Sequence, residues 1–144
     1  MQVSVLLQRK GSDVVTVAPE TPVEEVLGIL TENRIGAVVV TRDGAHIDGV
    51  ISERDIVTSL AGRGSDALGC QCQEVMSTEI ITCQPDTTVE ELMTTMTEHR
   101  VRHVPVVVDG RLSGVVSIGD VVKDRISGLE FETQALHDYI SRPY

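Results

Sequence analysis

Two serine–aspartate pairs, Ser52-x-x-Asp55 and Ser117-x-x-Asp120, are the residues of this chain best suited to binding chemistry. Each pair follows a short apolar, β-branched run and precedes a helical pattern, so the serine is placed to cap a helix. The N-terminus of such a helix offers unpaired N–H groups and a partial positive charge to a phosphate. An aspartate one turn inside the helix can accept hydrogen bonds from the two hydroxyls of a ribose.

For a single pair taken alone, a capping box without any ligand is the favoured interpretation. The two functions are compatible, because a cap positions the atoms that a ligand would meet. The pairs differ in the residue before the aspartate: Gly119 leaves space beside Asp120, whereas Arg54 precedes Asp55. Arg54 is either a phosphate contact or a solvated cation at the helix end.

The elements that carry these pairs occur twice. Residues 15–25 return as residues 81–91, and residues 49–57 return as residues 114–122. Each copy predicts strand, helix, strand, strand and helix, with Thr21 and Thr87 as helix N-caps and turns at 43–44 and 109–110. Residues 62–73 have a loop composition and connect the copies.

The predicted fold class is α/β (α+β), with two pseudo-two-fold-related units packed through their sheets. The strand segments 37–40 and 104–108 are continuously apolar, so we expect both of their faces to be covered. Because the unit is duplicated, any site at the junction of the copies can occur twice.

Composition argues against several other classes of protein. A formal net charge of -10 is unsuited to a nucleic-acid surface. There is neither an apolar run of membrane-spanning length nor a signal-like leader, so we expect no membrane association and a cytoplasmic location. Cys70 and Cys72 lack zinc-ligand spacing, and with Cys83 they are expected to be free thiols, with no metal bound.

The order, spacing and duplication of the motifs resemble tandem CBS domains, named after cystathionine β-synthase. The segments that carry this resemblance are Glu74-Val75-Met76-Ser77, Arg100-Val101-Arg102-His103-Val104-Pro105-Val106-Val107, Asp109-Gly110-x-x-x-Gly114-Val115-Val116 and the two serine–aspartate pairs. The likeness covers about residues 12–127. It implies CBS domains at 12–62 and 74–127, and a helix over 121–141 continues the second repeat.

The resemblance implies a regulatory module with two clefts, each built from both repeats, that bind AMP, ADP, ATP or NAD(H) for energy or redox sensing. One cleft then contains Thr16, Ile35, Gly36, Ala37, Val115, Ser117, Gly119 and Asp120. The other contains Val50, Ser52, Arg54, Asp55, Thr82, Val101, Arg102 and His103. Backbone groups of residues 35–37 would contact the adenine edge.

The two clefts differ in charge, because Arg102 and His103 stand where the first repeat has Gly36 and Ala37. We therefore expect the Asp55 cleft to hold more phosphate than the Asp120 cleft. If His103 contacts phosphate, the affinity should rise at mildly acid pH; the alternative is a structural histidine. His46, His99 and His137 show no metal or catalytic spacing and are expected at the surface.

Beyond the repeats, apolar or small residues recur at steps of four and three, which predicts a heptad-like seam on a C-terminal helix. The seam residues are Val122, Ile126, Leu129, Thr133, Leu136 and Ile140. We expect this seam to form a homodimer contact; the alternative is packing back onto the module. An apolar opening segment, with Val3, Val5, Leu6 and Leu7, is expected to pack as a short terminal element.

The sequence predicts no catalysis, since it offers no GxxxxGK or GxGxxG string, no acid–base pair, no activated nucleophile and no attached catalytic domain. A nucleotide sensor, with an unidentified regulated enzyme as its partner, is the favoured interpretation. The alternative is a ligand-independent interaction or dimerisation module that acts on an enzyme or transporter.

Overall fold

Two small sheets carry the two halves of the chain in a computed structural model that describes residues 1–11 and 13–142. The first sheet has the order β1-β2-β3, with β1 parallel and β3 antiparallel to β2. The second sheet pairs β4 with β5 antiparallel. The strands are β1 (Thr16–Val17), β2 (Ala37–Val40), β3 (Gly49–Ser52), β4 (His103–Val108) and β5 (Arg111–Ser117).

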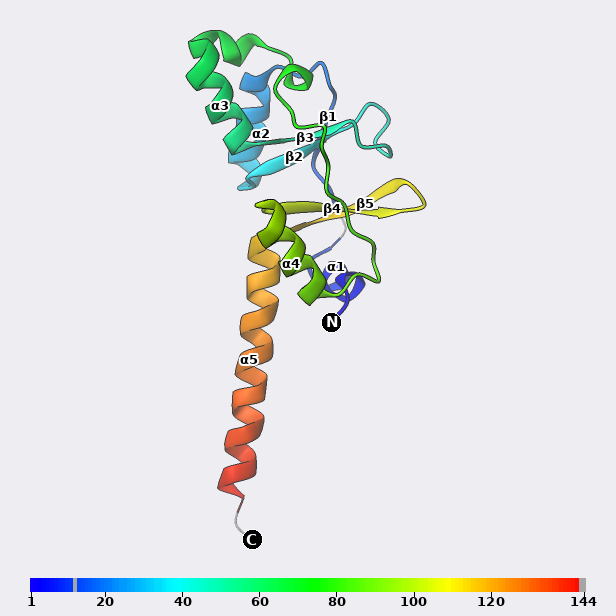
Figure 1. Ribbon diagram of the computed structural model, residues 1–144, viewed down its shortest axis with the longest axis vertical. Coiled ribbons are helices and arrows are strands. Elements are labelled where there is room, and N and C mark those ends of the chain that lie inside the picture. The colour runs from blue at the N-terminus through cyan, green and yellow to red at the C-terminus, as the bar shows by residue number, and fades with distance from the viewer. Residues whose placement is uncertain (12, 143–144) are drawn as a thin grey trace.

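The two sheets face each other, and the helices cover their outer faces (Figure 1). α2 and α3 lie beyond the first sheet, α1 and α4 lie beyond the second, and α5 extends away from the body. The helices are α1 (Val3–Lys10), α2 (Val23–Asn33), α3 (Glu53–Arg63), α4 (Val89–His99) and α5 (Ile118–Ser141), with 3-10 helices η1 (Gly64–Gly69) and η2 (Cys72–Glu74). The predicted α/β fold with two units packed through their sheets is confirmed.

The central strands are buried on both faces, as their continuous apolar pattern predicts. Val38, Val39 and Val40 are at most 3% exposed, although successive side chains of a strand point to opposite faces. Val104 and Val106 of β4 are completely buried. Helices cover one face of each sheet, and the other unit covers the opposite face.

The second sheet lacks the parallel third strand that the repeat predicts. Only Cys83 is paired: its N–H donates to the Pro105 carbonyl at 3.0 Å, and its carbonyl accepts from Val107 N–H at 2.9 Å. Pro105 occupies the position that Val39 holds in the first sheet. Because proline has no N–H, the ladder extends no further.

Both predicted helix N-caps are wrong by one residue. The helix N-caps are Pro22, without a side-chain bond, and Thr88, which forms a capping box with Glu91. Thr87 instead accepts from Gln84 N–H in the preceding turn. Both predicted turns form: residues 109–110 make a tight two-residue hairpin, and residues 43–44 turn within the longer segment 41–48 that joins β2 to β3.

Each unit is completed by the segment that precedes the other repeat. α1 packs Val3, Leu6 and Leu7 into the core of the second unit. Cys72 of η2 packs into the core of the first unit, so part of the predicted loop 62–73 is helical and buried. The opening segment is therefore the terminal packing element that the sequence predicts, and its partner is the distant half of the chain.

Candidate functional site

Both serine–aspartate pairs form reciprocal capping boxes. The Asp55 N–H donates to Ser52 Oγ at 3.3 Å, and the Ser52 N–H donates to Asp55 Oδ2 at 2.8 Å. The corresponding distances for Ser117 and Asp120 are 3.2 Å and 2.9 Å. The boxes begin α3 and α5, so each helix N-terminus lies where β3 or β5 ends.

Capping uses only one oxygen of each carboxylate. Every hydrogen bond that Asp55 or Asp120 accepts from the described residues ends on Oδ2. Oδ1 of each carboxylate is left for another donor, such as a ribose hydroxyl. The capping and ligand-binding interpretations of these pairs are therefore compatible.

Lys10, at the end of α1, contacts the Asp120 box from the far end of the chain. Its Nζ donates to Asp120 Oδ2 at 2.6 Å and to the Val115 carbonyl at 2.7 Å. Burial alone would raise the pKa of Asp120, but the bonds from Lys10 and Ser117 outweigh burial and lower it. Among the described residues, Asp55 has no ion-pair partner.

His103 lies where the two units meet. A Cβ added to Gly36 would lie 3.2 Å from His103 Cε1 and 3.7 Å from Glu53 Oε2, so a larger residue at position 36 would press on the His103 ring. His103 also pairs with Ser117 across the second sheet. It therefore lies between the residues predicted for the two clefts, and it is not confined to the Asp55 side.

Burial lowers the pKa of His103, although the nearby Glu53 carboxylate opposes this shift. Lys10 and Arg102 lower the pKa further, and Asp120 raises it. The net lowering reduces the fraction of His103 that is protonated at a given pH, which opposes the charged phosphate contact that the sequence suggested. The histidine is neutral over more of the pH range than a solvent-exposed one.

The remaining predicted site residues differ in exposure. Ile35, Ala37, Val50, Val101 and Val115 are partly buried, and Thr16, Arg54, Thr82, Arg102 and Gly119 are exposed. Val50 exchanges two backbone hydrogen bonds with Ser77, at 3.0 Å and 2.9 Å. On the other side, the carbonyl of the equivalent Val115 accepts from the Lys10 side chain instead.

The segments 35–37 and 101–103 are positioned by the same turn. Arg34 and Arg100 end α2 and α4 in the left-handed conformation, each with φ of 54°. The next residues bond back, from Ile35 N–H to the Leu30 carbonyl and from Val101 N–H to the Met96 carbonyl, both at 3.1 Å. The two repeats therefore enter β2 and β4 with the same geometry.

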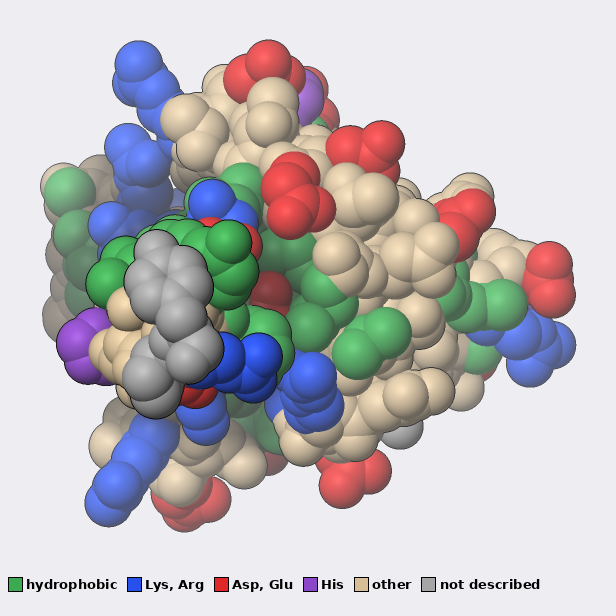
Figure 2. Space-filling view, turned by 90° about the horizontal axis from the view of Figure 1, so that it is seen from below, with side chains coloured by type: hydrophobic (Ala, Val, Ile, Leu, Met, Phe, Trp, Pro, Cys, Tyr) green, Lys and Arg blue, Asp and Glu red, His purple; other side chains and the backbone are tan. Residues whose placement is uncertain are grey.

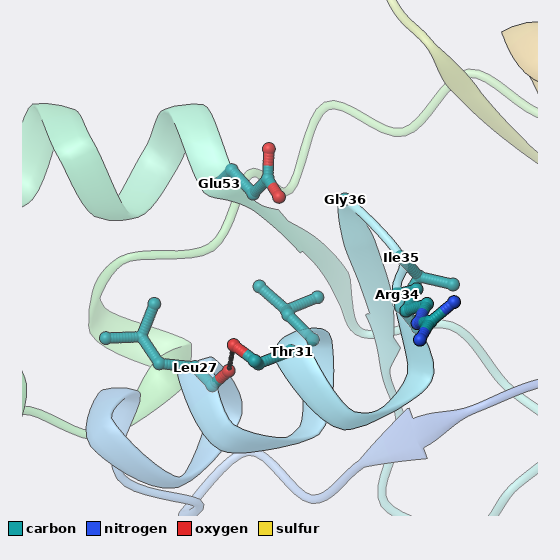
Figure 3. A pocket seen from close by; sticks show the side chains of 7 residues that line it. Leu27, Thr31, Arg34, Ile35, Gly36 and Glu53 are labelled. Atoms are coloured by element: carbon teal, nitrogen blue, oxygen red, sulfur yellow. Dashed lines mark hydrogen bonds between the residues drawn. The ribbon is translucent and has the colours of Figure 1, made fainter.

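A pocket of about 390 Å³ lies between α2 and the start of α3 (Figure 3). Its lining includes the predicted site residues Ile35 and Gly36, together with Glu53. Leu27 and Leu30 supply apolar surface, and the Thr31 hydroxyl donates a hydrogen bond to the Leu27 carbonyl at 2.8 Å. The pocket thus places part of the predicted adenine-contacting segment 35–37 beside the aliphatic side chains of Leu27 and Leu30.

Both halves of the chain match the same family model, described as the CBS domain, over residues 9–62 and 72–126. The chain belongs to the CBS-domain family. It is a CBS pair, which is a regulatory module.

Several proteins share this CBS pair. CBSX3, a mitochondrial protein of Arabidopsis thaliana, is 35% identical over 119 residues, which are 80% of this chain and 58% of CBSX3. YhcV of Bacillus subtilis is 29% identical over 116 residues, with 81% of each chain covered. This CBS pair thus spans little more than half the length of CBSX3.

Solved structures show the same fold. The CBS-domain protein ATU1752 of Agrobacterium tumefaciens has a TM-score of 0.84 and 46% identity, covering 87% of this chain and 99% of that one. The CBS pair of MJ0100, solved in complex with 5′-methylthioadenosine and S-adenosyl-L-methionine, has a TM-score of 0.76 and 23% identity, covering 85% of this chain and 98% of that one.

Sequence reasoning missed Lys10 and Glu53 of this CBS pair. Glu53 stands at an unspecified position of the Ser52-x-x-Asp55 motif, and Lys10 and Asp120 are 110 positions apart in the sequence. The basic residues at the end of α1 can be recognised in the sequence, but the sequence does not show that Lys10 pairs with Asp120.

The cysteines of the CBS pair are structural. Cys70, Cys72 and Cys83 are free, as predicted, and Cys72 Sγ lies 3.2 Å from the Ala18 carbonyl. Burial raises the pKa of Cys83 to about 11, which keeps this thiol protonated.

Within residues 1–11 and 13–142, no cluster of three or more His, Cys, Asp or Glu side chains is arranged to hold a metal ion. None of the helices in the same ranges is long and apolar enough to cross a membrane.

Proposed function

We propose that this CBS pair is a regulatory module that binds adenine nucleotides in two clefts between its repeats and has no catalysis of its own. The observation that carries the proposal is the open Oδ1 of Asp55 and Asp120, each at a capped helix N-terminus. The carboxylate suits a ribose, and the helix N-terminus suits a phosphate. The adenosyl ligands of the MJ0100 structure support the same ligand class.

The ligands we propose are AMP, ADP, ATP or NAD(H), with energy or redox sensing as the signal. Each cleft would combine one serine–aspartate pair with the turn segment of the other repeat, 35–37 or 101–103. The proposal includes a cytoplasmic location, a homodimer and an unidentified regulated enzyme as partner, with neither nucleic acid nor membrane as a target.

Lys10 adds a cation to the Asp120 cleft. A ribose would bind the open Oδ1, while Lys10 uses two of its three N–H donors on Asp120 Oδ2 and the Val115 carbonyl, so the third donor is available for a single phosphate. The Asp55 cleft retains Arg102 and Arg54 as candidate phosphate contacts, so it is still proposed to hold the more highly charged ligand. Arg102→Ala should then abolish discrimination between ATP and AMP at one site only, which calorimetry would detect.

A second function, a ligand-independent interaction module, is favoured by one observation. The Lys10 ammonium already occupies Asp120 Oδ2 and the Val115 carbonyl without any nucleotide. Thermal unfolding with AMP, ADP, ATP, NAD and S-adenosylmethionine separates the two functions. A ligand at 100 times its Kd should stabilise a binding protein by about 2.7 kcal/mol, and an interaction module should show no shift.

Calorimetry of aspartate variants tests the sites themselves. Asp120→Ala and Asp55→Ala should each weaken one site by about 1.5–3 kcal/mol, or roughly 10- to 150-fold. Glu91→Ala is the matched control, because it removes the same kind of box from the start of α4. Unchanged affinity in both aspartate variants would show that the boxes are only helix caps.

A lysine variant tests the Asp120 cleft separately. Lys10→Met should reduce the preference of that cleft for AMP over adenosine by roughly tenfold, because the phosphate loses its cation while the ribose keeps Asp120. Arg9→Met is the control, since Arg9 lies next to it on α1 but pairs with Asp124. An unaltered AMP-to-adenosine ratio would contradict a phosphate contact by Lys10.

A further inference from the structure

α5 carries an uncovered apolar seam along its length. All 24 residues from Ile118 to Ser141 form one helix, which extends away from the body (Figure 1). The predicted seam residues are exposed, from 46% at Val122 and Leu129 to 77% at Ile140, so packing back onto the module is wrong. Seen from below, hydrophobic side chains reach the surface around the end of the chain (Figure 2).

The seam and the body-facing side of α5 are different faces of the helix. Val121 is completely buried in the core of the second unit, and Asp124 pairs with Arg9 of α1 at 3.6 Å. In the heptad that the seam defines, these two residues hold positions c and f. The a and d positions therefore point away from α1 and are open to a partner.

The surface of the seam has the form that a coiled coil requires. Ile126, Leu129, Glu130 and Thr133 line a groove of about 410 Å³. They occupy positions a, d, e and the next a, four residues of the kind that form a hole for a partner's knob. Thr133 does not prevent burial, since its hydroxyl donates to the Leu129 carbonyl at 2.9 Å.

The charges that flank the seam select the orientation of the partner. In a parallel, in-register pair, Arg125 at g faces Glu130 at e of the second copy, and Glu132 faces His137. In an antiparallel pair that aligns the same layers, Glu130 would face Glu130 and Glu132 would face Glu132. Like charges at these positions are destabilising, so the parallel arrangement is favoured.

We infer that α5 pairs with α5 of a second copy of this chain as a parallel, two-stranded coiled coil. This inference rests on the homodimer of the proposed function and adds its surface, orientation and register. Its test needs no nucleotide, because the seam residues take no part in either serine–aspartate box.

Cysteine crosslinking tests the orientation. In a full-length Cys70→Ser background, Ile140→Cys should form a disulfide-linked dimer under mild oxidation, whereas Asp138→Cys, at the outward f position, should not. An antiparallel pair would separate the two residues 140 by about 27 Å and prevent the link. If the Ile140→Cys protein forms no link but sedimentation still shows a dimer, the inferred coiled coil is wrong and the homodimer stands. If sedimentation shows a monomer, both the coiled coil and the homodimer are wrong.

Charge reversal tests the register. Arg125→Glu and Glu130→Arg should each weaken the dimer roughly tenfold by sedimentation, because each places like charges together in both copies. The double variant should restore dimerisation. If the double variant is as weak as the singles while its circular dichroism is unchanged, residues 125 and 130 do not face each other and the inferred register is wrong.

Discussion

At the scale of single residues, the aspartates of the candidate site both cap a helix and leave one carboxylate oxygen for a ligand. Asp55 and Asp120 cap helices through Oδ2 and leave Oδ1 open, so folding itself holds the carboxylates in place. His103 is half-buried against Gly36 and Glu53, where its protonation state depends on the contact between the units.

His103 should make stability depend on pH. Its folded pKa lies below the unfolded value of 6.5, so the unfolded chain binds more protons and stability falls as the pH drops below about 6.5. The slope for one such group is at most about 1.4 kcal/mol per pH unit. Urea unfolding between pH 5 and 8 should show a shallower decline in His103→Gln than in the unmodified protein.

His99→Gln, at an exposed position, is the control for the loss of a histidine as such. If His103→Gln and the unmodified protein lose stability equally below pH 6.5, burial does not govern the protonation of His103.

At the scale of elements, two strand glycines, Gly49 and Gly114, lie where another segment packs too closely on the strand to leave room for a side chain. Gly49 of β3 contacts Met76, and an added Cβ would lie 2.9 Å from the Ser77 carbonyl. Gly114 of β5 holds the same place against Leu7 of α1. The two sheets are thus covered in the same way by different parts of the chain.

Gly49→Ala should destabilise the protein by about 2 kcal/mol or more in chemical unfolding. The Ser77 backbone cannot easily move aside, because it exchanges two hydrogen bonds with Val50. Gly128→Ala is the contrasting variant: it lies in α5 with open space around it and should stabilise the helix by about 0.5–1 kcal/mol. A Gly49→Ala protein as stable as the parent would show that the segment covering β3 yields readily.

At the scale of the whole molecule, the two units are interlocked. α1 completes the second unit and also delivers Lys10 to Asp120, while η2 completes the first unit. A change in α1 therefore affects a cleft built from residues more than a hundred positions away.

Leu6→Ala should cost about 2–5 kcal/mol, since Leu6 is 5% exposed in the core of the second unit. Hydrogen exchange should accelerate first in α4 and β5, not in α2 and β2, because α1 packs on the second unit. Gln8→Ala, on the exposed side of the same helix, is the control. Faster exchange mainly in α2 and β2 would contradict this assignment of α1.

The sequence by itself determined the repeat, the α/β fold, the buried strands and both capping boxes. These depend on local patterns: apolar runs fix the core strands, and a serine three residues before an aspartate fixes a helix start. The predicted N-caps Thr21 and Thr87 are each one residue too early: Thr87 and Thr88 offer the same hydroxyl chemistry, and the first helix begins after Pro22 without a side-chain cap. The third strand is missing beside β4 because Pro105 has no N–H to pair with it. The proline can be read in the sequence, but the segment that lies beside it cannot.

Only the tertiary structure decided which distant residues share a site. Lys10 meets Asp120 and His103 meets Gly36 because α1 crosses to the second unit and the two sheets face each other. No periodicity or motif encodes such pairs, since they depend on how the apolar faces of separate segments are covered. The sequence predicted the seam of α5, and the structure showed that the body leaves it open, because Val121 and Asp124 turn the opposite side of the helix inward.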